Sequence, residues 1–412
     1  MKIQAKAKWI STNLCEDLQV RTKNIRLLET LAVFALIFSW RVFVLWHGQI
    51  NHALWQDEIS WMRNAQAGSL LENIQLRDSG YPVPFSRLIL WILSNLSPGN
   101  AGLIHTYSAF VAAGSCASII MILGKHYSSK LLALLALIIG FFPTFDLLLF
   151  HNLSYFVYIP TISYLLDRVL VHNFTFFNGL ITTLLICLCP KPQLLLSILV
   201  ALFSILCVTR SRIALMVKNI ALPCFTTLFF FVLGRFDQSS IDLSITLRNM
   251  FQSLTALIYI PSAILFPWIS IGASGFSRMI DSSYLWWTSS IILVASNILL
   301  LNRIIGMNRI RLLGTLNGDR ARHSLLIFLF LAPIYFSLFV FPNSGWEGNY
   351  FWNATCTACL YQRHWLPTIF LFVLAGITLM HKSKVFFYLL VGTLVQVSTL
   401  AVIAYPYLYF PV

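Results

Sequence analysis

The sequence predicts an all-α, polytopic membrane protein with about eleven transmembrane helices, within a range of about ten to twelve. Of its 412 residues, 58% are apolar, 15% are aromatic and only 10% are charged. Apolar stretches of span length recur from Leu27 to the C-terminus. A large soluble protein with buried helices would instead need alternating polar faces and soluble loops between these stretches, and the chain has neither.

The net charge of +14 indicates membrane topology and not nucleic-acid binding. Basic residues gather in short loops that alternate with neutral or acidic loops, which is the pattern of the positive-inside rule. We therefore expect most of the Lys and Arg residues on the cytoplasmic side, together with the N-terminus. The outer side should hold most of the acidic residues.

The chain divides into a leader, one transmembrane domain and a short tail. Residues 1–27 are polar and basic and lack a small-residue cleavage site, so we interpret them as a cytoplasmic leader before a signal anchor. The transmembrane domain should cover 28–405, and 406–412 should form a short outer C-terminus. Apolar length and flanking charge predict spans at 28–46, 103–123, 131–149, 153–167, 178–189, 193–208, 219–234, 284–302, 324–341, 365–380 and 385–405.

One further apolar segment is not expected to cross. Leu254–Ile271 contains Pro261 and Pro267, and counting it as a span would invert the basic loop that follows. We interpret it as a re-entrant or interfacial element.

Three outer stretches are candidates for function, because loops this long are uncommon without one. They cover 47–102, 235–283 and 342–364. In the first, 58–74 and 85–96 have apolar residues at helical spacing but are too short to cross, so both should lie along the membrane surface. A proline-containing turn over Gly80–Pro84 joins them.

The strongest functional signal is the acidic pair Asp57 and Glu58, set between Trp55 and Trp61. A carboxylate at a membrane boundary is partly desolvated and can act as a general base towards a hydroxyl. A nearby Arg or Lys can hold a phosphate or another leaving anion. Asp57 could equally cap a helix that begins at Ile59, because acids are common at helix starts. Both interpretations stay open on the pattern alone.

Two outer-side cations stand in informative contexts. Lys191 lies in the rigid turn Pro190–Pro192 where a short span meets the outer surface, although a snorkelling lysine is the other explanation. Arg363 lies in a polar cluster before a span and beside Trp365, where it could serve as an interface anchor.

Aromatic and polar residues in the third outer stretch suit a sugar acceptor, which tends to stack on aromatic rings, or an ordinary interface belt. They are Trp346, Glu347, Tyr350, Trp352 and His364. Cys356 and Cys359 form a CxxC there, for which we favour a structural or incidental role over half a zinc site. His105 and His151, near the outer ends of spans, should be hydrogen-bonded structural histidines and not metal ligands.

The order of these features resembles the GT-C class of integral membrane glycosyltransferases, which use polyprenyl-phosphate sugars. In that class an Asp-Glu pair follows the first span, and a surface helix, an acid, a proline-containing turn and a second surface helix follow the pair. Asp57-Glu58, the helix through Leu71 and the run Asp78–Phe85 match that order over roughly residues 28–123. Many members have His-Pro-Pro where this chain has Gly80-Tyr81-Pro82. By size and form the chain also resembles bacteriophage-encoded, serotype-converting O-antigen glucosyltransferases.

The resemblance implies an inverting transfer of a sugar, with glucose expected, from a polyprenyl-phosphate donor to a lipopolysaccharide O-antigen or other polysaccharide acceptor. The reaction would take place on the periplasmic face of a bacterial inner membrane. Asp57 would be the base, and Glu58 would position it or bind the acceptor. The donor phosphate would contact outer-side cations, and the acceptor would contact Asp78 and Tyr81 besides the aromatic set above. The candidate cations are Lys191, Arg363, Arg87 and Arg63.

Other functions fit the sequence less well. A transporter or flippase of lipid-linked sugars is the main alternative, but it would place charges near the bilayer midplane and show related halves. An outer-face acyltransferase would need a histidine–acid pair within one loop. The chain has no Walker pattern for a cytosolic nucleotide. We expect no resident cofactor, with a divalent metal left open, and the lipid bilayer as a partner.

Overall fold

The computed structural model describes residues 2–47, 57–78, 81–98, 100–141, 150–170, 175–189, 199, 220–229, 329, 366–380 and 383–408. Within them the chain is helical apart from one pair of two-residue strands. This confirms the all-α part of the predicted fold class. Two helical stretches are long and apolar enough to cross a membrane, Asn24–Trp46 and Ala101–Leu123. The predicted elements at 254–271 and 284–302 lie outside the described residues, as do 193–208 and 324–341 except for Leu199 and Leu329.

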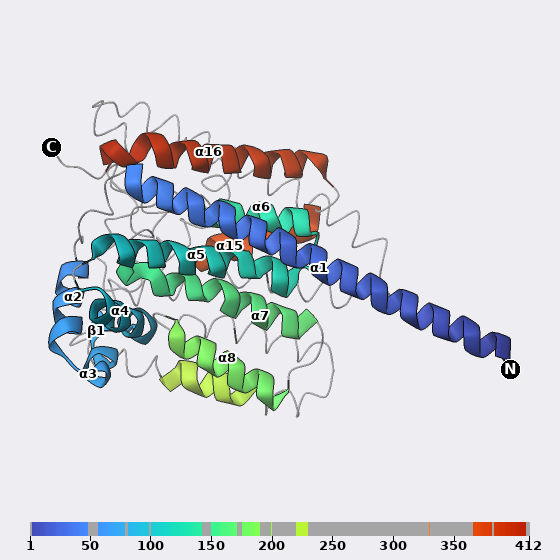
Figure 1. Cartoon of the computed structure of the whole chain (residues 1–412), viewed down its shortest axis with the longest axis horizontal. Helices are drawn as coiled ribbons and strands as arrows, with labels where there is room; N and C mark the ends of the chain where they lie inside the picture. Colours follow the sequence, from blue (N-terminus) through green and yellow to red (C-terminus); the bar gives the residue numbers. More distant parts are fainter. Residues whose placement is uncertain are drawn as a thin grey trace, which may run out of the picture.

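The main body is a set of roughly parallel helices (Figure 1). They are α1 (Lys2–His47), α5 (Ala101–Leu123), α6 (Ser129–Gly140), α7 (Tyr158–Leu170), α8 (Phe176–Leu188), α15 (Leu366–Met380) and α16 (Lys384–Leu408). Helix α5 is central, since α1, α6 and α7 all pack against it. Helix α16 packs against α6, and α8 packs against α7.

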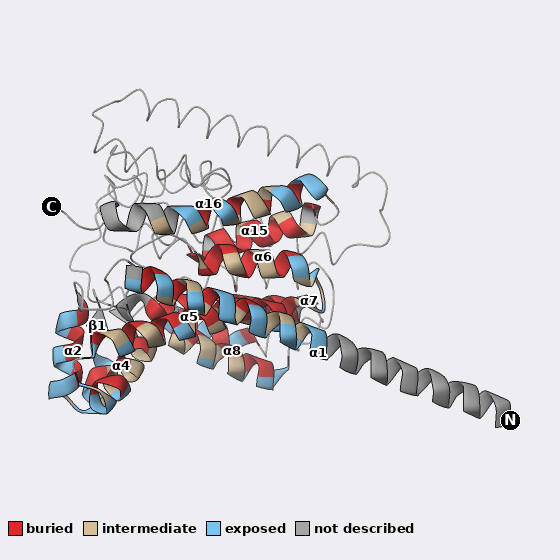
Figure 2. Cartoon of the chain, turned by 45° about the horizontal axis from the view of Figure 1, so that its top comes forward, coloured by how far each residue is buried: buried red, intermediate tan, exposed pale blue. Residues whose placement is uncertain are grey.

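The core lies between the helices at the middle of this body. Fully buried side chains such as Ile120, Leu135, Ile162 and Leu374 come from α5, α6, α7 and α15 and form one cluster. Figure 2 shows the same helices mostly as buried, whereas α1 and α16 carry exposed faces. Those faces are apolar and include Leu36 on α1, which is 55% exposed.

The structure describes the predicted span at 131–149 only up to Phe141, and 142–149 lie outside the described residues. Helix α6 ends at Gly140, and Pro143 follows three residues later, where a proline cannot continue a helix. The carbonyl of Gly140 instead accepts a hydrogen bond from Nη1 of Arg41 at 3.3 Å. The predicted span at 153–167 also differs at its start, because Phe150–Val157 form a 3₁₀ helix, η3, that leads into α7.

The first outer stretch forms a cap at the end of the body where α5 begins (Figure 1). It contains α2 (Asp57–Ala67), α3 (Leu70–Gln75), β1 (Arg77–Asp78), β2 (Tyr81–Pro82) and α4 (Pro84–Leu96). The turn predicted over Gly80–Pro84 is wrong in its bounds, because Tyr81 and Pro82 form β2 and Pro84 begins α4. The chain reverses before them, and Asp78 faces Tyr81 in the antiparallel pair.

The single helix predicted over 58–74 is two helices. Ser69 begins α3 with a capping box, in which its hydroxyl accepts from the amide of Glu72 and the Glu72 carboxylate accepts from the Ser69 amide. A capping box provides hydrogen-bond partners for the free amides at a new helix start, so it favours a break at Gly68 over one continuous helix.

Candidate functional site

The candidate site is the cap together with the parts of the body that it covers. A small apolar cluster joins Trp61 of α2, Leu90 of α4, Ile104 of α5 and Leu153 of η3. Helices α2 and α4 pack against each other, and both also contact η3. The cap is thus fixed to the helix body by its own core, and the polar residues below lie around that core.

The acidic pair stands at the start of α2. Asp57 is the first residue of the helix, two residues before the expected start at Ile59. The amide dipoles of a helix stabilise negative charge at this position. The structure describes the backbone of Asp57 but not its side chain. The next residue, Glu58, is 2% exposed and therefore faces into the protein.

Glu58 forms a hydrogen bond with His105 across the boundary between cap and body. Its Oε2 lies 3.0 Å from Nε2 of His105, and the two side chains are 2% and 0% exposed. Within the described part of the chain, the other ring nitrogen, Nδ1, has no hydrogen-bond partner. A buried carboxylate is costly unless it is hydrogen-bonded or paired, so this contact compensates the burial of Glu58 and holds the start of α2 against α5.

A buried arginine lies under the same helix. The guanidinium carbon of Arg87 is 3.7 Å from the ring centroid of Trp61, and Arg87 is 4% exposed. A desolvated cation over an indole face contributes about 2 kcal/mol of attraction. The neighbouring hydroxyl of Ser86 accepts a hydrogen bond from the amide of Ser154 in η3 at 3.2 Å. Arg87 and Ser86 therefore link α4 to both α2 and η3.

A second indole fixes the turn between α2 and α3. Nε1 of Trp91 donates to the carbonyl of Gly68 at 3.2 Å. On the exposed side of α3, the two hydrogen bonds from Ser69 hold the pKa of the Glu72 carboxyl below its ordinary value. Glu72 stays charged at the start of α3, where the helix dipole also favours it.

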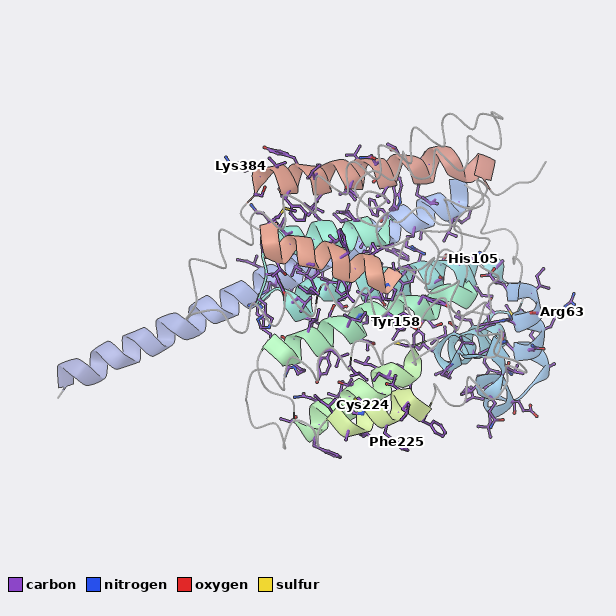
Figure 3. All side chains as sticks on the ribbon, turned by 180° about the vertical axis from the view of Figure 1, so that it is seen from behind. Arg63, His105, Tyr158, Cys224, Phe225 and Lys384 are labelled. Atoms are coloured by element: carbon purple, nitrogen blue, oxygen red, sulfur yellow. The ribbon has the colours of Figure 1, made fainter. Side chains whose placement is uncertain are left out.

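The structure places the predicted site residues in different settings. Arg63 is exposed on the outer side of α2 and points away from His105 (Figure 3). Asp78 and Tyr81 are paired on the β1–β2 backbone, and their side chains are not described. The remaining candidates lie outside the described residues: Lys191, Trp346, Glu347, Tyr350, Trp352, Arg363 and His364.

Sequence reasoning treated His105 as a structural, hydrogen-bonded residue and did not connect it to the acidic pair. The structure confirms the hydrogen bond and identifies its partner as Glu58, 47 residues earlier. One feature of the sequence pointed to this contact: His105 lies at the beginning of the span that follows the loop containing Glu58, so both residues are expected near the same membrane face. Among the described residues, no group of three or more His, Cys, Asp or Glu side chains is arranged to hold a metal ion.

No protein-family model matches this chain, and neither a curated protein nor a solved structure matches it.

Proposed function

We propose that this chain is a polyprenyl-phosphate-sugar-dependent glycosyltransferase of GT-C type, with about eleven transmembrane helices. It would transfer a sugar, with glucose expected, to an O-antigen acceptor on the periplasmic face of the inner membrane, with inversion at the anomeric carbon. The observation that carries the proposal is the start of α2. There Asp57 directly precedes a carboxylate that is buried and held by His105.

The exposed surface of the helices supports a membrane environment. On α1, Leu28, Leu36, Phe43 and Trp46 are each about half exposed or more. Contiguous apolar surface of this kind is unfavourable in water and favourable against lipid chains. Helix α5, with 23 residues, is about 35 Å long and so matches the hydrocarbon thickness of a bilayer.

The distribution of charge supports the orientation. The end of the body opposite the cap carries Arg26, Lys125, Lys130, Arg168 and Lys384, and we call it the basic end. Lys384 and His105 lie at opposite ends of the body in Figure 3. By the positive-inside rule the basic end faces the cytoplasm, which puts the cap on the periplasmic side.

The proposed reaction is a single displacement. Asp57 accepts the proton of an acceptor hydroxyl as its oxygen attacks the anomeric carbon of the donor sugar. The bond between that carbon and the phosphate oxygen breaks, and polyprenyl phosphate leaves with the bonding electron pair. Base assistance by a positioned carboxylate contributes about 10² to 10⁴ in rate. Glu58, held by His105, fixes the first turn of α2 and thereby the position of Asp57.

Cations would stabilise the departing phosphate. The candidates remain Lys191, Arg363, Arg87 and Arg63. Among the two that the structure describes, Arg87 lies beneath Trp61 inside the cap and Arg63 lies on its outer surface.

The test is transfer of radiolabelled glucose from polyprenyl-phosphate glucose to lipopolysaccharide by the purified full chain. We expect Asp57→Asn to lower the rate by about 10² to 10⁴. Glu72→Gln is the matched control, because Glu72 is an exposed acid at another helix start in the same cap. Equal activity of Asp57→Asn and wild type would contradict the assignment of the base. Absence of transfer by wild type, with protein-dependent movement of the labelled lipid across vesicles, would favour the flippase.

A further inference from the structure

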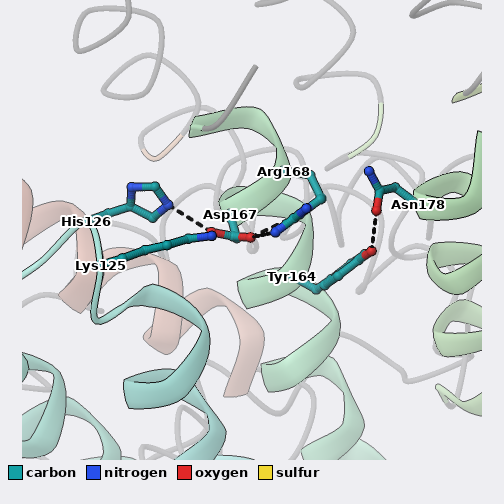
Figure 4. A network of polar contacts seen from close by, with 6 residues as sticks. All are labelled: Lys125, His126, Tyr164, Asp167, Arg168 and Asn178. Carbon is teal, nitrogen blue, oxygen red and sulfur yellow. Dashed lines mark hydrogen bonds and ion pairs between the residues drawn. The ribbon is translucent and has the colours of Figure 1, made fainter. Parts of the chain in front are cut away.

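A second polar cluster lies at the basic end, away from the cap, and the proposed reaction does not use it (Figure 4). Its centre is Asp167, near the end of α7. Oδ1 of Asp167 lies 2.7 Å from Nζ of Lys125 and 2.8 Å from Nε2 of His126. Oδ2 accepts from Nε of Arg168 at 3.0 Å and also from Nη2 of the same guanidinium. Three basic side chains therefore meet on one carboxylate.

The acid is inside this cluster and the basic groups are outside. The side chain of Asp167 is 3% exposed, whereas that of Lys125 is 40% exposed, that of Arg168 is 23% exposed and that of His126 is 20% exposed. One carboxylate neutralises only one of the two permanent cations. The outward surface of the cluster is therefore positive, and a buried acid holds its groups in place.

The cations keep hydrogen-bond donors for a further acceptor. An ammonium has three N–H groups and a guanidinium has five. Among the described contacts, Lys125 uses one donor on Asp167, and Arg168 uses its Nε and Nη2 side. An anion with several oxygens, such as a phosphate, matches the remaining donors of Lys125 and Arg168.

The cluster lies at the depth of lipid headgroups if α5 crosses the membrane. Lys125 and His126 follow directly after α5, which ends at Leu123. The aliphatic part of the Arg26 side chain, on α1, lies beside Gly124, the residue before Lys125. A Cβ added at Gly124 would be only 3.0 Å from Cδ of Arg26. Arg26 therefore adds positive charge beside the cluster, and Glu29 one turn further along α1 is the nearest described acid on that helix.

A purely structural role explains only part of this arrangement. The cluster does tie elements together, since Oη of Tyr164 on α7 donates to Oδ1 of Asn178 on α8 at 2.7 Å (Figure 4). One cation on Asp167 would be sufficient to bury that acid. Lys125 and Arg168 contact Asp167 and still remain accessible to solvent, so together they form a binding surface.

We propose that Lys125, His126 and Arg168 form a binding site for the phosphate of an anionic lipid headgroup. Lys125 and Arg168 contact the phosphate, Asp167 positions the two cations, and His126 helps to hold Asp167 in place. The site does not depend on transferase activity. A free phosphate ion shares this chemistry, so the experiment separates the two sources.

The experiment measures the thermal unfolding midpoint of the purified full chain in bicelles. The difference between phosphatidylglycerol and phosphatidylcholine is recorded for each variant, so that a loss of basal stability cancels. We expect phosphatidylglycerol to raise the midpoint of wild type. Lys125→Gln and Arg168→Gln should each weaken the lipid affinity derived from a titration by about fivefold, the usual contribution of one cation near an anionic surface. Lys130→Gln is the control, because Lys130 is exposed at the same end and outside the cluster.

Three outcomes decide the proposal. A loss in Lys125→Gln and Arg168→Gln that Lys130→Gln does not share supports a defined lipid site. Equal losses in all three variants, or no effect of phosphatidylglycerol on wild type, would overturn it in favour of general surface attraction. Stabilisation by inorganic phosphate in phosphatidylcholine bicelles, lost in the same two variants, would keep the phosphate site but overturn the lipid as its source.

Discussion

The contact between Glu58 and His105 predicts a large and specific effect of removing the imidazole. His105 is fully buried and its Nε2 lies 3.0 Å from the Glu58 carboxylate. A hydrogen bond to a charged group contributes about 1.5–3 kcal/mol. Removing the partner of a buried carboxylate costs about 3–5 kcal/mol, because the carboxylate stays in a low-dielectric site. We therefore expect His105→Ala to lower the free energy of unfolding by about 3–5 kcal/mol.

His126 supplies the matched control for this measurement. It also contacts a carboxylate through Nε2, at 2.8 Å from Asp167, but its side chain is 20% exposed. Asp167 retains Lys125 and Arg168 after His126→Ala. The expected loss is below about 1 kcal/mol, as for other exposed pairs. Both variants are measured by denaturant unfolding in the same detergent, with wild type as the reference.

A third variant separates the hydrogen bond from the volume of the ring. His105→Gln retains an N–H donor for Glu58, so it should recover part of the stability that His105→Ala loses. If the pair also positions Asp57, the transfer rate should follow the same order: wild type, then His105→Gln, then His105→Ala. Equal losses of stability in His105→Ala and His126→Ala would refute the reasoning, because burial would then not determine the effect.

The remaining predictions concern packing and pH. A Cβ at Gly140 would lie 2.6 Å from Cγ2 of the buried Ile37, so Gly140→Ala should cost about 1–3 kcal/mol of unfolding free energy through overpacking of α6 on α1. A Cβ at Gly392 would meet no atom of the described residues within 4 Å, so Gly392→Ala in the same denaturation assay should be neutral or stabilising, and the opposite ranking would contradict the packing. The Ser69 hydrogen bonds lower the pKa of the Glu72 carboxyl. The stabilisation that the ionised Glu72 gives to the capping box of α3 is therefore complete above the ordinary carboxyl pKa, and it is lost as pH falls through the lowered pKa. The amides of residues 69–75 should therefore be better protected from exchange in wild type than in Glu72→Gln at neutral pH, and this difference should disappear at acidic pH. Equal protection in both proteins at neutral pH would argue against the capping box.

The helical class and many of the element positions were predictable from local signals. The predicted spans at 103–123, 365–380 and 385–405 correspond closely to α5, α15 and α16, because continuous apolar length specifies a buried or lipid-facing helix. The surface helix predicted at 85–96 corresponds to α4, which begins with Pro84 at the first helical position. The prolines at 82 and 84 indicated a turn over Gly80–Pro84, but the two-residue strands β1 and β2 were not predicted.

Predictions from local sequence patterns were incomplete at two helix ends. At one of them a nearby capping motif begins a new helix, and at the other a distant side chain contacts the last carbonyl. Ser69 and Glu72 form a capping box, a readable motif that the helical spacing of apolar residues over 58–74 obscured. The end of α6 at Gly140 involves Arg41, 99 residues earlier, whose guanidinium donates to that carbonyl. A short stretch of sequence around Gly140 does not include Arg41, so a local pattern does not reveal this contact.

The candidate site consists mainly of contacts of this distant kind. Glu58 and His105 are 47 residues apart, and the Ser86–Ser154 hydrogen bond joins residues 68 apart. The cap helices α2 and α4 are 11 and 13 residues long, so neither has enough intrinsic stability to define its own position. The positions of α2 and α4 therefore depend on α5 and η3, through the contacts of His105 with Glu58 and of Ser154 with Ser86. A residue can therefore be essential for the proposed reaction without contacting either substrate. Among the described residues, His105 is the strongest candidate for such a role, because it holds the first turn of α2 through Glu58.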